Sequence, residues 1–85
     1  MNYNATAYKM DSEGRTISVQ AVEVNENGLV VRAAGYWSHR VGTEAYDADW
    51  RGTFFSNVAE VRIEPGTRGY MERIARMMGS EELVA

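Results

Sequence analysis

The dipeptide Asn27-Gly28 constrains the fold of this chain more than any other local feature. Both residues readily adopt a positive φ, as a two-residue hairpin turn requires, and strand-like segments flank them at 17–26 and 29–34. A two-residue turn would place Val22 opposite Ala33, Val24 opposite Val31 and Glu23 opposite Arg32. One face of the predicted hairpin is then apolar, and the other carries a complementary charge pair.

A second tight turn is predicted at residues 11–14, where the sequence Asp-Ser-Glu-Gly is rich in turn-forming residues. Pairing Met10 with Ile17 across this turn would bring Tyr8 opposite Val19. The first three strands would then form an antiparallel meander.

The middle strand of that meander changes its apolar phase. Ile17 and Val19 occupy odd positions, whereas Val22 and Val24 occupy even ones. Either a β-bulge at Gln20 or Ala21 restores a single apolar face, or the strand is buried on both faces.

The centre of the chain has weak periodicity. We expect a loop over 42–49, a strand over 50–55, and a single helical turn at 57–60, where the residues have the spacing of a capping box. A short strand follows over 61–64, and Pro65-Gly66 ends the sheet.

The C-terminal residues predict an amphipathic helix over 67–78 with Thr67 as its N-cap, followed by a short acidic tail over 80–85. The predicted apolar face comprises Tyr70, Met71, Ile74, Met77 and Met78, and the opposite, basic face includes Arg68, Arg73 and Arg76. If this basic face is functional, it would bind an acidic patch or phosphates.

These elements predict a single α+β domain over 1–85, mainly β over 1–64. The expected architecture is an antiparallel sheet of four or five strands with the C-terminal helix packed on one face. The alternative is a small, partly closed barrel of the SH3-like or OB-like kind. Since the chain has no cysteine, its core alone must stabilise it.

A cytoplasmic protein is expected. Residues 1–14 lack the basic and apolar runs of a signal peptide, and no apolar run approaches the roughly 20 residues that span a bilayer. The net charge of −3 weakens the case for a nucleic-acid partner.

Six of the nine aromatic residues lie within 36–55, beside three carboxylates. Tyrosine and tryptophan are enriched at the centres of protein interfaces, so this segment predicts a protein-binding surface. Its residues are Tyr36, Trp37, Glu44, Tyr46, Asp47, Asp49 and Trp50. Within the segment, Trp50, Phe54 and Phe55 are also expected to fill the core, which leaves Tyr36, Trp37 and Tyr46 as the better surface candidates.

Catalytic chemistry has little support in the sequence. His39 and Ser38 are adjacent and would point to opposite faces of an extended chain, and the usual triads cannot be built without cysteine or a second histidine. Asp47 and Asp49 could approach one divalent ion from an extended loop, but no ligand loop of the EF-hand kind accompanies them. We therefore expect no enzyme activity, no metal and no cofactor.

The expected function is a small non-enzymatic module that binds another protein, which has a basic surface. Compact acidic proteins of this kind include phage-encoded inhibitors of host systems, such as anti-CRISPR proteins. The alternative is a nucleic-acid-binding small barrel that uses aromatic rings together with arginines, namely Arg15, Arg32, Arg40, Arg51 and Arg62. No membrane partner is expected, and the chain would be a monomer or a homodimer formed through an edge strand.

Overall fold

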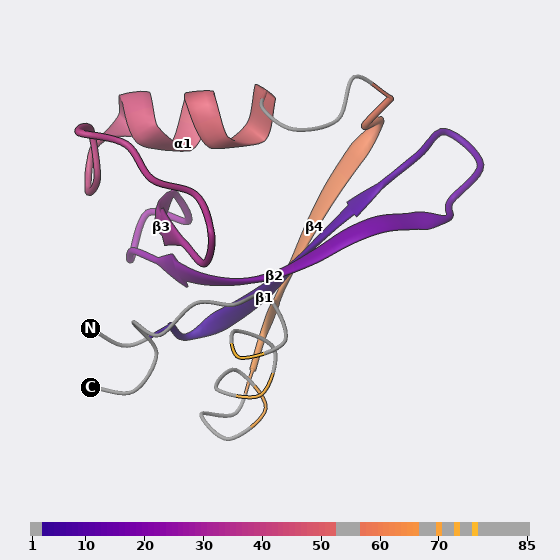
Figure 1. Cartoon of the computed structure of the whole chain (residues 1–85), viewed down its shortest axis with the longest axis horizontal. Helices are drawn as coiled ribbons and strands as arrows, with labels where there is room; N and C mark the ends of the chain where they lie inside the picture. The colour runs from indigo at the N-terminus through magenta and orange to yellow at the C-terminus, as the bar shows by residue number, and fades with distance from the viewer. Residues whose placement is uncertain (1–2, 53–56, 67–69, 71–72, 74–75, 77–85) are drawn as a thin grey trace.

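The computed structural model describes residues 3–52, 57–66, 70, 73 and 76, and its framework consists of four antiparallel strands and the helix α1. In chain order these elements are β1 (Ala5–Met10), β2 (Thr16–Val24), β3 (Val30–Ala33), α1 (Glu44–Gly52) and β4 (Glu60–Pro65). The strand order in the sheet is β3-β2-β1-β4, with α1 on one side of it (Figure 1). The α+β prediction is confirmed, and the sheet is open rather than a closed barrel.

The two hairpin turns of the meander share one hydrogen-bond pattern. In each, an Asp or Asn side-chain oxygen accepts from the backbone N–H groups two and four residues later, at 2.9–3.0 Å. The first turn runs from Asp11 to Arg15 and the second from Asn25 to Leu29. Gly14 and Gly28 occupy equivalent positions with φ of +80° and +83°, a region that glycine adopts without steric cost.

The observed strand registers agree with the predicted ones far from the turns and differ from them by one residue next to the turns. Far from the turns the predictions are confirmed: Tyr8 pairs with Val19, Val22 with Ala33 and Glu23 with Arg32. Next to the turns they are wrong, because Met10 pairs with Thr16 and Val24 with Val30. In each hairpin a register shift separates these two regions and leaves one residue, Ile17 or Val31, without an opposite partner in the ladder.

The middle strand β2 is buried on both faces at its centre. Gln20, Ala21 and Val22 are consecutive and all buried, and the pairing with β1 runs without a shift from Ser18 to Val22. The bulge predicted near Gln20 is therefore wrong, and the alternative of burial on both faces is confirmed.

The helix α1 covers one face of the sheet. Ala7 and Val22 lie in a single apolar cluster with Tyr46 and Trp50 of the helix. The predictions of a loop over 42–49 and a strand over 50–55 are wrong for 44–52, which is helical. Residues 53–56, including Phe54 and Phe55, lie outside the described part of the chain.

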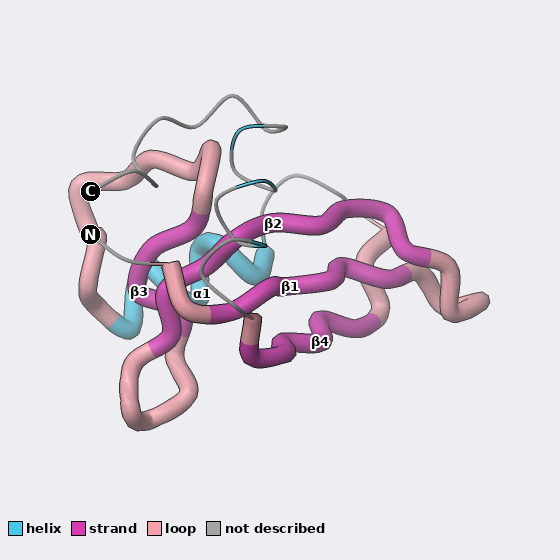
Figure 2. Tube along the Cα trace, turned by 90° about the horizontal axis from the view of Figure 1, so that it is seen from below, coloured by secondary structure: helices cyan, strands magenta, loops and turns pink. Residues whose placement is uncertain are grey.

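The last strand, β4, confirms the strand predicted at 61–64, but the helical turn expected before it is absent: residues 58 and 59 are irregular and Glu60 already begins the strand. β4 pairs with β1 over six consecutive positions without a register shift. Among the strands that the structure describes, β4 lies at one edge of the sheet and β3 at the other (Figure 2).

Most of the predicted C-terminal helix, including Arg68, and the acidic tail lie outside the described residues. Tyr70, Arg73 and Arg76 are described, and all three are helical and exposed. Tyr70 was expected on the apolar face, but it is 40% exposed and the Arg73 guanidinium lies 5.8 Å from its ring. A hydrogen bond to Tyr70 raises the pKa of Tyr8. No helix among the described residues is long and apolar enough to cross a membrane.

Candidate functional site

The predicted binding segment is divided by the structure into a buried part and an exposed part. Tyr46 and Trp50 are fully buried and Asp47 is nearly so. The expectation that Tyr46 lies at the surface is therefore wrong. Trp37 is 62% exposed, Glu44 is exposed, and Tyr36 and Asp49 are half-buried.

The burial follows from the helical conformation of 44–52. Thr43 acts as the N-cap, since its Oγ1 accepts a hydrogen bond from the Tyr46 N–H at 3.1 Å. Carboxylates of Glu44 and Asp47 occupy the first turn, where the helix dipole favours negative charge. The nine residues are too few for a clear periodicity, but Thr43 as a cap and the i,i+4 pair of Asp47 with Arg51 were signals that predict a helix.

Asp47 attaches the helix to the edge strand β3. Its Oδ1 accepts a hydrogen bond from the Val30 N–H at 2.8 Å. The Arg51 Nε donates to both carboxylate oxygens, at 3.1 and 3.0 Å. The carboxylate is thus committed to two partners and has a structural role.

Tyr46 binds the same edge of β3 three residues further along the strand, at Ala33. Its hydroxyl accepts a hydrogen bond from the Ala33 N–H at 2.7 Å and donates to the Tyr36 carbonyl at 3.0 Å. Burial raises the pKa of Tyr46 to about 12. The Gly42 N–H also donates to the Val31 carbonyl at 2.9 Å. The outer edge of β3 is thus hydrogen-bonded to two side chains of α1 and to the backbone of the preceding loop.

Trp50 lies against the sheet and organises two buried polar groups. Its Nε1 donates to the Gln20 Oε1 at 3.1 Å, and the Lys9 Nζ donates to the Trp50 carbonyl at 2.7 Å. The Lys9 Nζ also lies 4.6 Å from the indole centroid. Burial, followed by the nearby charge of Arg51, lowers the pKa of Lys9. The prediction that Trp50 fills the core is confirmed.

The exposed part of the segment is the loop from Tyr36 to Thr43, which carries Trp37. The Tyr36 N–H donates to the Ala33 carbonyl at 3.1 Å, and the Arg40 N–H donates to the Ser38 Oγ at 3.1 Å. The Arg40 guanidinium binds the Asp49 carboxylate of α1 at 2.7 Å. Hydrogen bonds at both ends and in the middle thus fix the loop that presents Trp37.

Asp47 and Asp49 do not converge on one point. The proposal of a shared ion assumed an extended loop, but residues two apart on a helix point in widely different directions. Asp47 binds Val30 and Arg51, whereas Asp49 binds Arg40. Within the described residues, no group of three or more potential ligand side chains could hold a metal ion.

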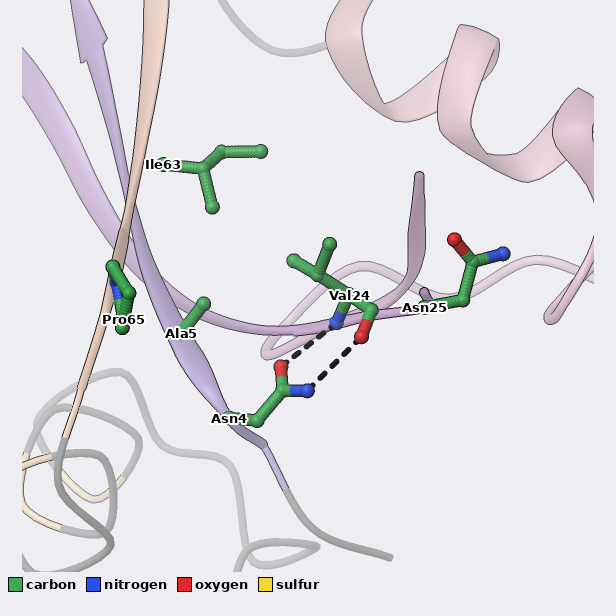
Figure 3. Close-up of a pocket in the computed structure, with 6 residues that line it drawn as sticks. All are labelled: Asn4, Ala5, Val24, Asn25, Ile63 and Pro65. Atoms are coloured by element: carbon green, nitrogen blue, oxygen red, sulfur yellow. Dashed lines mark hydrogen bonds between the residues drawn. The ribbon is translucent and has the colours of Figure 1, made fainter. Parts of the chain in front are cut away.

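An open pocket of about 340 Å³ lies on the sheet face beside α1, and Figure 3 shows its lining residues. They are Asn4, Ala5, Val24, Asn25, Ile63 and Pro65. None of these side chains titrates. The Asn4 amide is bonded to the backbone N–H and C=O of Val24, and the Asn25 oxygen is bonded within its own turn. The pocket therefore offers neither an acid nor a base for catalysis.

In comparisons with known proteins, the chain matched no protein-family model, no curated protein and no solved structure.

Proposed function

We propose that this chain is a small non-enzymatic module that binds another protein, with Trp37 as the central anchor of the binding surface. The observation that carries the proposal is the exposure of Trp37, 62% on a loop that hydrogen bonds hold in place. Tryptophan is highly buried on average in folded proteins, and it is among the residues that contribute most to binding energy.

The rigidity of the loop supports this proposal. The Tyr36 carbonyl is held by the buried Tyr46 hydroxyl, and Gly42 is bonded to Val31 of β3. A side chain on a fixed loop loses less conformational entropy on binding than one on a mobile loop. Tyr46, a buried residue of the predicted site, therefore helps to fix the loop that carries Trp37.

The carboxylates of α1, the helix that follows the Trp37 loop, favour a partner with a basic surface. Glu44 is exposed at the start of α1, and Asp49 lies on the same helix in an ion pair with Arg40. An arginine or lysine of the partner would be attracted to the exposed Glu44 carboxylate and to the face of the indole ring. Inhibitors that phages direct against the nucleic-acid channels of host complexes, anti-CRISPR proteins among them, bind surfaces of this chemistry.

The alternative, nucleic-acid binding through arginines, receives less support. Arg15, Arg40, Arg51 and Arg62 each lie within 4.0 Å of a carboxylate of this chain, at 2.7–3.7 Å. Guanidinium groups that are already paired gain less from a phosphate. A gel-shift assay at low salt separates the two functions, since binding that weakens steeply with added salt would favour nucleic acid.

The experiment that tests the proposal is affinity capture from the native host with the native chain and two single variants. Trp37→Ala removes the anchor, and Tyr70→Ala removes the other large exposed hydrophobic side chain of the described residues as a matched control. We expect the native chain and Tyr70→Ala to capture the same protein and Trp37→Ala to lose it. Equal capture by Trp37→Ala would rule out this surface.

A further inference from the structure

The two edge strands of the sheet, β3 and β4, differ in whether their outer backbone groups have hydrogen-bond partners among the described residues. The outer N–H groups of Val30 and Ala33 on β3 are bonded to Asp47 and Tyr46. Within the described residues, β4 has one neighbouring strand, β1, and none on its outer side (Figure 2). An unprotected edge strand is a template for pairing with another chain.

The backbone groups that β4 offers can be assigned from the hydrogen-bond pattern. The Gly66 N–H donates to the Asn4 carbonyl, and Ala5 pairs with Pro65. Because bonding alternates along an antiparallel ladder, Glu64 and Arg62 direct their N–H and C=O groups to β1. Val61, Ile63 and Pro65 then direct theirs outward, and the absence of an N–H on Pro65 suits this outward position.

We propose that a second copy of this chain pairs with β4 in antiparallel fashion, about a two-fold axis at Ile63, to form a homodimer with a continuous sheet. The charges on β4 are the observation that selects this occupant. Glu60, Arg62 and Glu64 alternate with the apolar Val61 and Ile63 along the strand, and their charges are negative, positive and negative. All three charged side chains are exposed.

The side chains distinguish the registers centred on Val61, Arg62 and Ile63, the middle residues of β4. An axis at Arg62 would place Arg62 opposite its own copy and Glu60 opposite Glu64, so that like charges face each other. An axis at Val61 would pair Ile63 with Ala59, whose N–H is already donated to Met10 within the same chain.

An axis at Ile63 avoids both problems: like charges do not face each other, and the paired backbone N–H groups are not already bonded within the chain. Arg62 of each copy then faces Glu64 of the second copy, and the two Ile63 residues exchange backbone hydrogen bonds at the axis. Each Val61 N–H can donate to the Pro65 carbonyl of the second copy. The Ile63 side chains meet on the face that carries α1, next to the pocket that Ile63 and Pro65 line (Figure 3).

This dimer is independent of the proposed binding surface, because Trp37 follows β3 at the opposite edge of the sheet. Both Trp37 surfaces would remain accessible. The assembly would be bivalent, and it could bind two sites on a repetitive or dimeric target with increased avidity.

Sedimentation at increasing concentrations tests the dimer directly. The native chain should shift from its 9.5 kDa monomer to twice that mass. Arg62→Glu should raise the dissociation constant about tenfold, since attractive cross-strand pairs become repulsive. The double variant Arg62→Glu, Glu64→Arg should dimerise as the native chain does, because the complementary pairs return only with the axis at Ile63. A native chain that stays monomeric, or a double variant that does not recover, would overturn the proposal.

A disulfide provides a second test that does not depend on the charges. The chain has no cysteine, so Ile63→Cys introduces a single thiol. Hydrogen-bonded antiparallel residues lie about 5.5 Å apart at Cα, within the range of a disulfide. Ile63→Cys should therefore form a covalent dimer on mild oxidation. The control Val61→Cys, whose two thiols would be roughly 13 Å apart along the strands, should not. Equal cross-linking of both variants would contradict the register.

Discussion

The Asp47 carboxylate accepts a hydrogen bond from the Val30 N–H at 2.8 Å, and this contact joins α1 to the outer edge of β3. Asp47 is 8% exposed, and Arg51 neutralises its charge from the same helix. A residue that the sequence placed in a binding surface therefore has its main role in the fold. The same holds for Tyr46, which bridges Ala33 and Tyr36.

Replacing Asp47 by alanine should lower the free energy of unfolding by about 2 kcal/mol, because the Val30 N–H would lose its partner. Chemical denaturation followed by circular dichroism measures the change. Asp49→Ala is the matched control on the same helix. Its ion pair with Arg40 is partly exposed, so the loss should stay within about 0.5 kcal/mol. Equal losses for the two variants would argue against a structural role for the Asp47 contact.

The Tyr46 hydroxyl should make the fold sensitive to alkali. Its pKa is about 12 in the folded protein and 10.0 for the ordinary side chain. A group with a raised folded pKa stabilises the fold fully below pH 10 and loses that contribution as the pH rises toward 12. The loss from Tyr46 should be roughly 2 kcal/mol. Tyr46→Phe should be less stable at neutral pH and should show a smaller alkaline loss. Identical pH profiles for both proteins would refute this assignment.

Lys9 should have the opposite effect on the pH profile. Burial lowers its pKa below the usual 10.5, so the folded state binds its proton less tightly than the unfolded state does. Stability should therefore rise as the pH passes through the folded pKa toward 10.5. The difference in unfolding free energy between the native chain and Lys9→Met isolates this effect. That difference should move in favour of the native chain as the pH rises, and a constant difference would contradict the assignment.

The sequence predicted those features that depend on local turn chemistry and strand alternation. Asn27-Gly28 located the second hairpin, and the alternation at 61–64 located β4. It did not predict α1, because a nine-residue helix has little periodicity and because aromatic residues favour strands.

The sequence predicted only part of the candidate site, because it did not predict the helix α1. Exposure of Trp37 and burial of Tyr46 and Trp50 depend on how α1 packs on the sheet. The sequence also did not predict the strand register next to each turn. Asp11 and Asn25 each begin a five-residue turn that their side-chain hydrogen bonds stabilise. Such bonds link residues whose spacing alone also fits shorter turns.

Gly28, the fourth residue of the second turn, should be required for full stability of the fold. Gly28 has a φ of +83°, and an added Cβ would meet no atom within 4 Å, so the cost of a substitution lies in the backbone. Gly28→Ala should lower the unfolding free energy by about 1 kcal/mol. Gly52 at the end of α1 has equal space and no positive φ, and Gly52→Ala should not destabilise the protein. Thermal unfolding of both variants decides between a conformational and a steric requirement.

The most direct test of the proposed function is the affinity of Trp37→Ala for the captured protein, measured by calorimetry beside its unfolding free energy. Because Trp37 is exposed, the substitution should change stability by less than about 0.5 kcal/mol. As the anchor of the surface, Trp37 should contribute about 2 kcal/mol or more to binding, a loss of affinity of roughly thirtyfold. Unchanged affinity, or a loss that only accompanies unfolding, would contradict the proposal.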